Sequence, residues 1–223
     1  EWSNYQVIDP AGAKSWCCGW FGVNSKGDIR QWAEWPDRDT FGEWAVEGKS
    51  STRSDDSVTW KKGPAAIDCG GLSFQQLQME WAKVEGDIPI YERIIDCRFA
   101  HGPHQTAMDG KRTLQDDLDD FGINTVPSCG YTEAIGLPKI QEWLAFDPKQ
   151  PFNKFTNSPK CRLSRACGNS IFSYMNYCQN GKKDDALKDC IDLSRYAATH
   201  DDGSGIAFYG KGSMAQKSQG GAY

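Results

Sequence analysis

Cysteine is the feature that most constrains this chain, because nine cysteines occur in 223 residues and two of them are adjacent, at Cys17 and Cys18. Structural zinc sites need short thiolate pairs such as C-x-x-C together with partner cysteines or histidines. No such pair occurs here, and the chain has only three histidines. The spacings therefore favour disulfides over a metal site, and they indicate an oxidising compartment and a secreted, extracellular protein.

The adjacent cysteines are expected to reach different partners, because a bond between neighbours strains the peptide that joins them. Nine thiols allow four disulfides and leave one cysteine over. A helical hairpin that carries Cys178 and Cys190 is expected to be joined by disulfides to Cys161 or Cys167. These expectations describe a disulfide-rich fold.

Composition and charge narrow the class of protein further. With 39% hydrophobic residues the chain can bury a core, and its net charge of -5 and pI near 5.3 argue against a nucleic-acid partner. No run of eighteen apolar residues is present, so no membrane span is expected. The first residues, EWSNYQVIDP, lack the basic start and apolar stretch of a targeting peptide.

The pattern changes near the middle of the chain, which predicts an α+β fold with a β-barrel-like N-terminal half and a mainly helical C-terminal half. Residues 1–97 hold most of the tryptophans and short β-branched runs at 57–60 and 88–97. A helix is predicted between Ser73 and Gly86. Residues 98–202 form a helical region, and the Gly-rich tail 203–223 could return to the first region as a strand.

Four further helices are predicted in the second region from apolar spacing and capping residues. The first starts at Thr113 and stops at Gly122, and the second follows Pro138. The third and fourth cover 169–181 and 184–198.

Carboxylate chemistry suits a secreted protein that needs no cofactor. Glycoside hydrolysis uses a protonated acid and an ionised carboxylate across a cleft whose aromatic rings stack on sugars. The N-terminal half interleaves acids with aromatic residues. The candidate sugar-binding rings are Trp16, Trp20, Trp32, Trp35 and Trp44.

Two stretches resemble the expansin and barwin-like double-psi β-barrel proteins, which are related to glycoside hydrolase family 45. The segment 66–97 matches the end of that barrel at Asp68, Phe74, Pro89, Tyr91 and Cys97, among other positions. The segment 203–223 resembles the opening strand of the barrel through its Phe-Tyr-Gly sequence, which includes Tyr209. The two stretches occur in the reverse of the family's order, so one barrel would require a permuted chain.

The resemblance implies that Asp68 acts as the general acid and that Tyr209 joins the sugar-binding surface. SWCCGW lacks the second catalytic aspartate of the related hydrolases, so the resemblance implies a base from elsewhere, Asp28 or Asp96, or non-hydrolytic loosening. The expected function is action on a cell-wall polysaccharide. The alternative is a non-catalytic secreted effector, defence or structural protein. The oligomeric state stays open.

Overall fold

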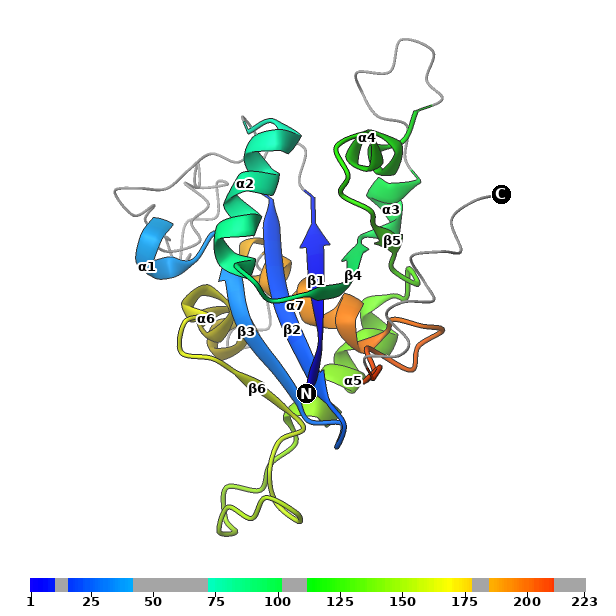
Figure 1. Ribbon diagram of the computed structural model, residues 1–223. Helices are drawn as coiled ribbons and strands as arrows, with labels where there is room; N and C mark the ends of the chain where they lie inside the picture. Colours follow the sequence, from blue (N-terminus) through cyan, green and yellow to red (C-terminus); the bar gives the residue numbers. More distant parts are fainter. Residues whose placement is uncertain (11–15, 42–71, 102–111, 178–184, 211–223) are drawn as a thin grey trace, which may run out of the picture.

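The protein folds around a mixed six-stranded sheet with helices on both faces (Figure 1). The computed structural model describes residues 1–10, 16–41, 72–101, 112–177 and 185–210. The strands are β1 (Trp2–Asp9), β2 (Cys17–Asn24), β3 (Ile29–Trp35), β4 (Ile90–Ile95), β5 (Val126–Pro127) and β6 (Cys161–Leu163). The helices are α1 (Arg38–Phe41), α2 (Phe74–Glu85), α3 (Cys97–Ala100), α4 (Leu114–Asp120), α5 (Glu133–Leu144), α6 (Gly168–Asn176) and α7 (Asp185–Ala198).

The strand order is β5-β4-β1-β2-β3-β6, only β2 runs opposite to the other strands, and the path of the chain across the sheet reverses at β1. On one side β1, β2 and β3 form an antiparallel meander, and on the other side β4 and then β5 run parallel to β1. The β2–β3 turn is fixed by Asn24, whose side-chain oxygen accepts hydrogen bonds from the backbone N–H groups of Lys26 and Asp28. Parallel strands end at the same edge, so β1 and β4 bring their carboxyl ends together.

Alternating side chains of the strands fill two hydrophobic clusters, one on each face. Tyr5 and Val7 of β1 belong to the cluster that α7 covers, and Ile8 belongs to the cluster that α2 and α4 cover. In Figure 1, α2 crosses the front of the sheet and α7 lies behind it. The core is therefore a three-layer arrangement of helix, sheet and helix.

The expected β-barrel-like half is wrong, because the strands form an open sheet whose edges are the short strands β5 and β6. The broader prediction, a fold that contains both helices and strands, is confirmed. The sheet takes β5 and β6 from the region after residue 97, and α7 packs on β1 and β2.

The expected disulfides are also wrong for the seven described cysteines, none of which forms a disulfide. In the buried cluster the Sγ atoms of Cys17 and Cys190 lie 3.9 Å apart, well beyond the disulfide bond length of about 2.05 Å. Cys17 and Cys18 point to opposite faces of β2 and enter different clusters, as neighbours on a strand must. These cysteines act as small apolar core residues. The expectation of secretion was based on disulfides, so the described cysteines no longer support it.

Several predicted elements are confirmed. Ser73 caps α2 and Thr113 caps α4, each in a reciprocal capping box. Strand β4 lies within the predicted run 88–97, and α7 matches 184–198 closely. Helix α5 begins before Pro138, which lies inside it. The predicted strand 57–60 lies outside the described residues.

Glu34 is a buried carboxyl group at the end of β3, only 4% exposed. It accepts hydrogen bonds from the backbone N–H groups of Asn169 and Ser170, at 2.7 and 2.8 Å, at the start of α6. Burial raises the pKa of Glu34 to about 7, although these hydrogen bonds act in the opposite direction. The group therefore titrates near neutral pH.

We expect Glu34 to make the folded state less stable as pH rises. Its folded pKa lies above its unfolded value, so its contribution is fully present below the unfolded pKa of 4.5 and is lost as pH rises through about 7. Denaturant unfolding of the wild type between pH 5 and 8 should show this loss, up to about 3 kcal/mol. Glu34→Gln should flatten the curve. Exposed Glu142→Gln is the matched control, and parallel curves for wild type and Glu34→Gln would contradict the prediction.

Candidate active site at the carboxyl ends of β1 and β4

Two aspartates lie side by side where β1 and β4 end. The parallel register pairs Ile8 with Ile95, and the backbone N–H of Asp96 donates to the carbonyl of Ile8 at 3.3 Å. Asp9 and Asp96 each follow these residues directly. Side-chain alternation places both aspartates on the face that α7 covers. In open sheets, ligands bind outside the carboxyl ends of strands where the topology changes, as it does at β1.

Helix α7 adds two more carboxylates from one helical face. Asp189, Asp192 and Tyr196 follow one another at helical spacing, so their side chains lie on the same side of α7. Asp192 is 4% exposed and Tyr196 is 2% exposed. Both aspartates act electrostatically on Asp9. Asp9 therefore lies within electrostatic range of three other carboxylates, those of Asp96, Asp189 and Asp192.

Asp9 lies in an environment that disfavours a negative charge. Burial raises the pKa of Asp9 well above its usual range, and the charges of Asp189, Asp192 and Asp96 raise it further. The guanidinium of Arg98 acts in the opposite direction. Added positive charge in the cluster would therefore favour the ionised form of Asp9.

Asp96, by contrast, is well supplied with hydrogen-bond donors. Its carboxylate accepts hydrogen bonds from the Arg98 guanidinium and, at 2.7 Å, from the hydroxyl of Tyr196. Burial would raise the pKa of Asp96, but these hydrogen bonds outweigh it and lower the pKa. Asp96 is 2% exposed through its side chain whereas Arg98 is 66% exposed, so the cation partner can leave into solvent.

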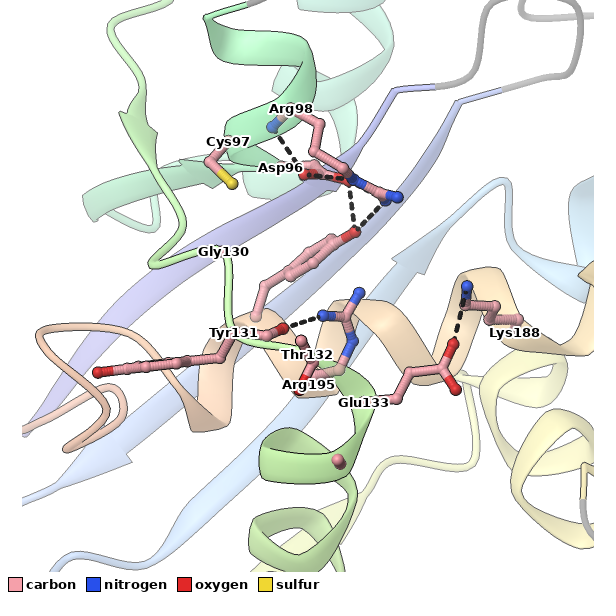
Figure 2. A pocket seen from close by; sticks show the side chains of 11 residues that line it. Asp96, Cys97, Arg98, Gly130, Tyr131, Thr132, Glu133, Lys188 and Arg195 are labelled. Carbon is pink, nitrogen blue, oxygen red and sulfur yellow. Dashed lines mark hydrogen bonds and ion pairs between the residues drawn. The ribbon is translucent and has the colours of Figure 1, made fainter.

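The opposite wall carries basic side chains (Figure 2). Arg195 donates to Asp192 at 2.8 Å and to the carbonyl of Tyr131 at 2.6 Å, and its guanidinium lies 4.6 Å from the centre of the Tyr196 ring. Lys188 pairs with Glu133 at 2.9 Å. Gly136 of α5 makes the close approach of Arg195 possible, because a Cβ atom there would collide with its side chain.

Between these walls lies a pocket with a volume of about 420 Å³. Asp96 and Arg98 line one side, and Glu133, Lys188 and Arg195 line the other. The pocket thus offers acidic and basic groups together, a combination that suits an anionic ligand accompanied by cations.

The carboxylate oxygens have the chemistry of ligands for hard divalent cations such as Mg²⁺. Among the described residues, however, no three His, Cys, Asp or Glu side chains form a group that could hold a metal ion as they stand. Asp96 and Asp192 face guanidinium groups instead. A bound cation would therefore have to replace Arg98 as the partner of Asp96.

Of the catalytic residues predicted from sequence, Asp96 lies in this site. Asp28 lies in the β2–β3 turn, where the Asn24 amide donates to its carboxylate at 2.9 Å, and this turn is at the opposite end of the sheet from Asp9. Asp68 lies outside the described residues. The structure therefore does not bring Asp28 near Asp96.

The predicted sugar-binding rings do not gather around the pocket. Trp16, Trp20 and Trp35 are buried in the cluster beneath α2, and Trp32 packs against it. Tyr209 stacks on Tyr91, with ring centres 4.6 Å apart. Trp44 lies outside the described residues. The described residues therefore give no support to a polysaccharide partner.

Four residues of this site, Asp9, Asp189, Asp192 and Tyr196, were not predicted from the sequence. Two signals for them are present. Asp9 follows the apolar pair Val7-Ile8 directly, and Asp189 and Asp192 lie on one face of a predicted helix. Neither signal links the strand to the helix, since the two elements lie near opposite ends of the chain.

Comparison with known proteins shows that no family model matches the chain and no curated protein matches its sequence. Two solved structures are similar, both of the large terminase from a thermophilic bacteriophage, in different crystal forms. Each has a TM-score of 0.49 and 13% sequence identity, and the alignment covers 88% of this chain. The chain spans 39% of the terminase in one case and 38% in the other.

The resemblance to expansins and glycoside hydrolase family 45 is wrong, because the described strands form an open six-stranded sheet and not a barrel. The segment matched to the end of the double-psi barrel instead contributes α2 and β4. The associated description as a secreted, disulfide-bonded glycosidase is withdrawn with it.

Proposed function

We propose that this protein is a nuclease, a phosphodiester-cleaving enzyme whose four clustered aspartates recruit divalent cations. The observation that carries this proposal is the convergence of Asp9 and Asp96 at the strand ends with Asp189 and Asp192 of α7. The raised pKa of Asp9 supports it, because a cluster with more carboxylates than fixed cations has room for added positive charge. Bound cations would activate water and neutralise charge on the phosphate, as in carboxylate-rich phosphoryl-transfer sites.

The basic wall of the pocket supports a phosphate as the substrate group. Arginine and lysine are the side chains that recognise phosphate oxygens, the arginine through paired N–H groups. Arg98 is exposed, and on release from Asp96 it could contact a phosphate at the mouth of the pocket. Lys188 and Arg195 both pair with the carboxylate of Asp192.

Because acidic residues outnumber basic ones in this chain, the proposed activity should depend strictly on divalent cations. A protein with net charge -5 repels a polyanion at long range, and the aspartate cluster repels it at short range. Cations in the cluster reverse the local sign. Substrate should therefore bind at this site only when the divalent cation is present.

The testing experiment is cleavage of labelled single- and double-stranded DNA and RNA with Mg²⁺ or Mn²⁺, and with EDTA as the control. We expect cleavage with a divalent cation and none with EDTA. Cation affinity, followed by thermal shift, should rise with pH because protons compete for Asp9, whose pKa is raised. Failure to cleave any nucleic acid with any divalent cation would overturn the proposal. Release of sugar from polysaccharides in a parallel assay would point to glycan chemistry instead.

No helix in the described part of the chain has the length and apolar character needed to cross a membrane.

A further inference from the structure

Residues 146–160, named here the aromatic loop, join α5 to β6 and project from the sheet beside β6 (Figure 1). Three phenylalanines of this loop are exposed to solvent. Phe155 is 89% exposed, Phe152 is 60% exposed and Phe146 is 43% exposed. Such exposure of large apolar rings is unfavourable in water unless a partner covers them.

The aromatic loop is held in shape from within. Asn157 is 8% exposed, and its amide nitrogen donates to the carbonyl of Asp147 at 2.9 Å and to those of Gln150 and Pro151 at 3.2 Å each. Its amide oxygen accepts from the N–H of Asp147 at 2.9 Å. The backbones of Asn153 and Asn157 also bond to each other at 2.8 and 3.1 Å. The phenylalanines are therefore displayed on an ordered frame, which lowers the entropy cost of binding.

The aromatic loop is basic although the whole chain is acidic. It contains Lys149, Lys154 and Lys160 against a single acid, Asp147, whereas the chain carries a net charge of -5. Arg162, the second residue of β6, places its guanidinium 5.5 Å from the centre of the Phe152 ring. Positive charge is thus concentrated around the exposed rings.

From these observations we infer that the aromatic loop is a binding element for single-stranded nucleic acid. Sequence-tolerant single-strand binding combines cations that contact phosphates with aromatic rings on which unpaired bases stack. Phe152 and Phe155 are separated by exposed Asn153 and Lys154, so each ring is available to one base. The core of a protein interface is instead apolar and depleted of charged residues such as lysine.

The aromatic loop would contact a part of the bound nucleic acid that is distant from the aspartates. Strand β6 starts beside Ile29, at the beginning of β3, and β1 runs in the same direction as β3. The loop and Asp9 therefore lie at opposite ends of the sheet, roughly 25 Å apart for about eight residues of strand. The ligand class rests on the proposed function, but binding can be measured without cleavage.

The test is fluorescence anisotropy of a labelled oligothymidine of about 20 nucleotides with the full chain in EDTA, where no cleavage is expected. Phe152→Ala/Phe155→Ala should raise the Kd by about 10-fold or more, since each base–aromatic stack contributes substantially. Asn157→Ala should also weaken binding while both rings remain. Met79→Ala, which removes a 59% exposed apolar side chain from α2, should leave the Kd unchanged.

Two outcomes would overturn the inference. One is a wild type that does not bind the oligonucleotide in EDTA, and the other is a double variant that binds like the wild type. If the double variant instead abolishes self-association in sedimentation experiments, the loop is a protein contact. Cleavage of short duplexes tests the aspartate site separately, so either proposal can fail while the other stands.

Discussion

Asp9→Asn is expected to abolish phosphodiester cleavage while leaving the protein folded. Removing groups that only orient a metal ligand costs about 10–100-fold, so loss of a carboxylate that itself holds the cation should cost more than about 100-fold. Asparagine has a similar shape but no charge, so it relieves the repulsion from Asp189, Asp192 and Asp96. The measurement is the initial rate of cleavage at saturating Mn²⁺.

The stability of the same variant separates a catalytic role from a structural one. The folded pKa of Asp9 lies above its unfolded value, so wild-type stability is lost as pH rises past the ordinary carboxyl range, and Asp9→Asn should lose less. Asp87→Asn, at an exposed position before β4, is the matched control for both measurements. Cleavage by Asp9→Asn at the wild-type rate would remove Asp9 from the site. If Asp9→Asn lost folding stability together with activity, the role of Asp9 would be structural.

Trp20→Ala is expected to lower the free energy of unfolding by about 3–5 kcal/mol, the usual cost of deleting a large buried aromatic side chain. Trp20 is fully buried between the sheet and α2, and its indole N–H donates to Glu85 at 2.9 Å. Truncation leaves a cavity and removes this hydrogen bond. Chemical denaturation followed by far-UV circular dichroism gives the value.

Trp2→Ala provides the comparison, because Trp2 is 43% exposed and its removal should cost much less. Trp20→Phe should recover most of the lost stability. If Trp20→Ala proved as stable as the wild type while its binding to a polysaccharide disappeared, the ring would have the sugar-binding role predicted from sequence. A loss of stability in Trp20→Ala close to that in Trp2→Ala would contradict its place in the core.

Helices with local signals were predictable, and strands buried on both faces were not. Ser73 with Gln76 and Thr113 with Asp116 form capping boxes within four residues, so sequence alone located α2 and α4. In β2, seven consecutive residues are buried, so alternation of polar and apolar side chains is absent. Strand β1 has the same character. A strand between two helical layers shows no period of two.

The candidate site was only partly predictable for a related reason. Asp96 was proposed as a catalytic base, and the structure places it in the aspartate cluster. Its neighbours come from residue 9, which the parallel pairing of β1 with β4 places beside it, and from α7, which packs on the sheet. Such pairing depends on a long crossover connection that no local pattern describes.

The cysteines and tryptophans were misleading at the level of sequence because both are core residues here. Trp20 and Trp35 are 0% and 1% exposed, and Cys18, which is 0% exposed, belongs to the same cluster. A large apolar residue and a small one together fill space between the sheet and α2. Counting such residues predicted a disulfide framework and a sugar platform, whereas close packing explains both.

The alkylation rate of the buried thiols of Cys17 and Cys190 reports on the separation of α7 from the sheet. They lie 3.9 Å apart between β2 and α7, and their mutual hydrogen bond together with burial raises the pKa of Cys17, so neither is open to reagents in the closed structure. Alkylation of Cys190 therefore requires α7 to separate from the sheet, while exposed Cys129 reacts at once. The ratio of the two alkylation rates, followed by mass spectrometry, measures how often the helix that carries Asp189 and Asp192 opens.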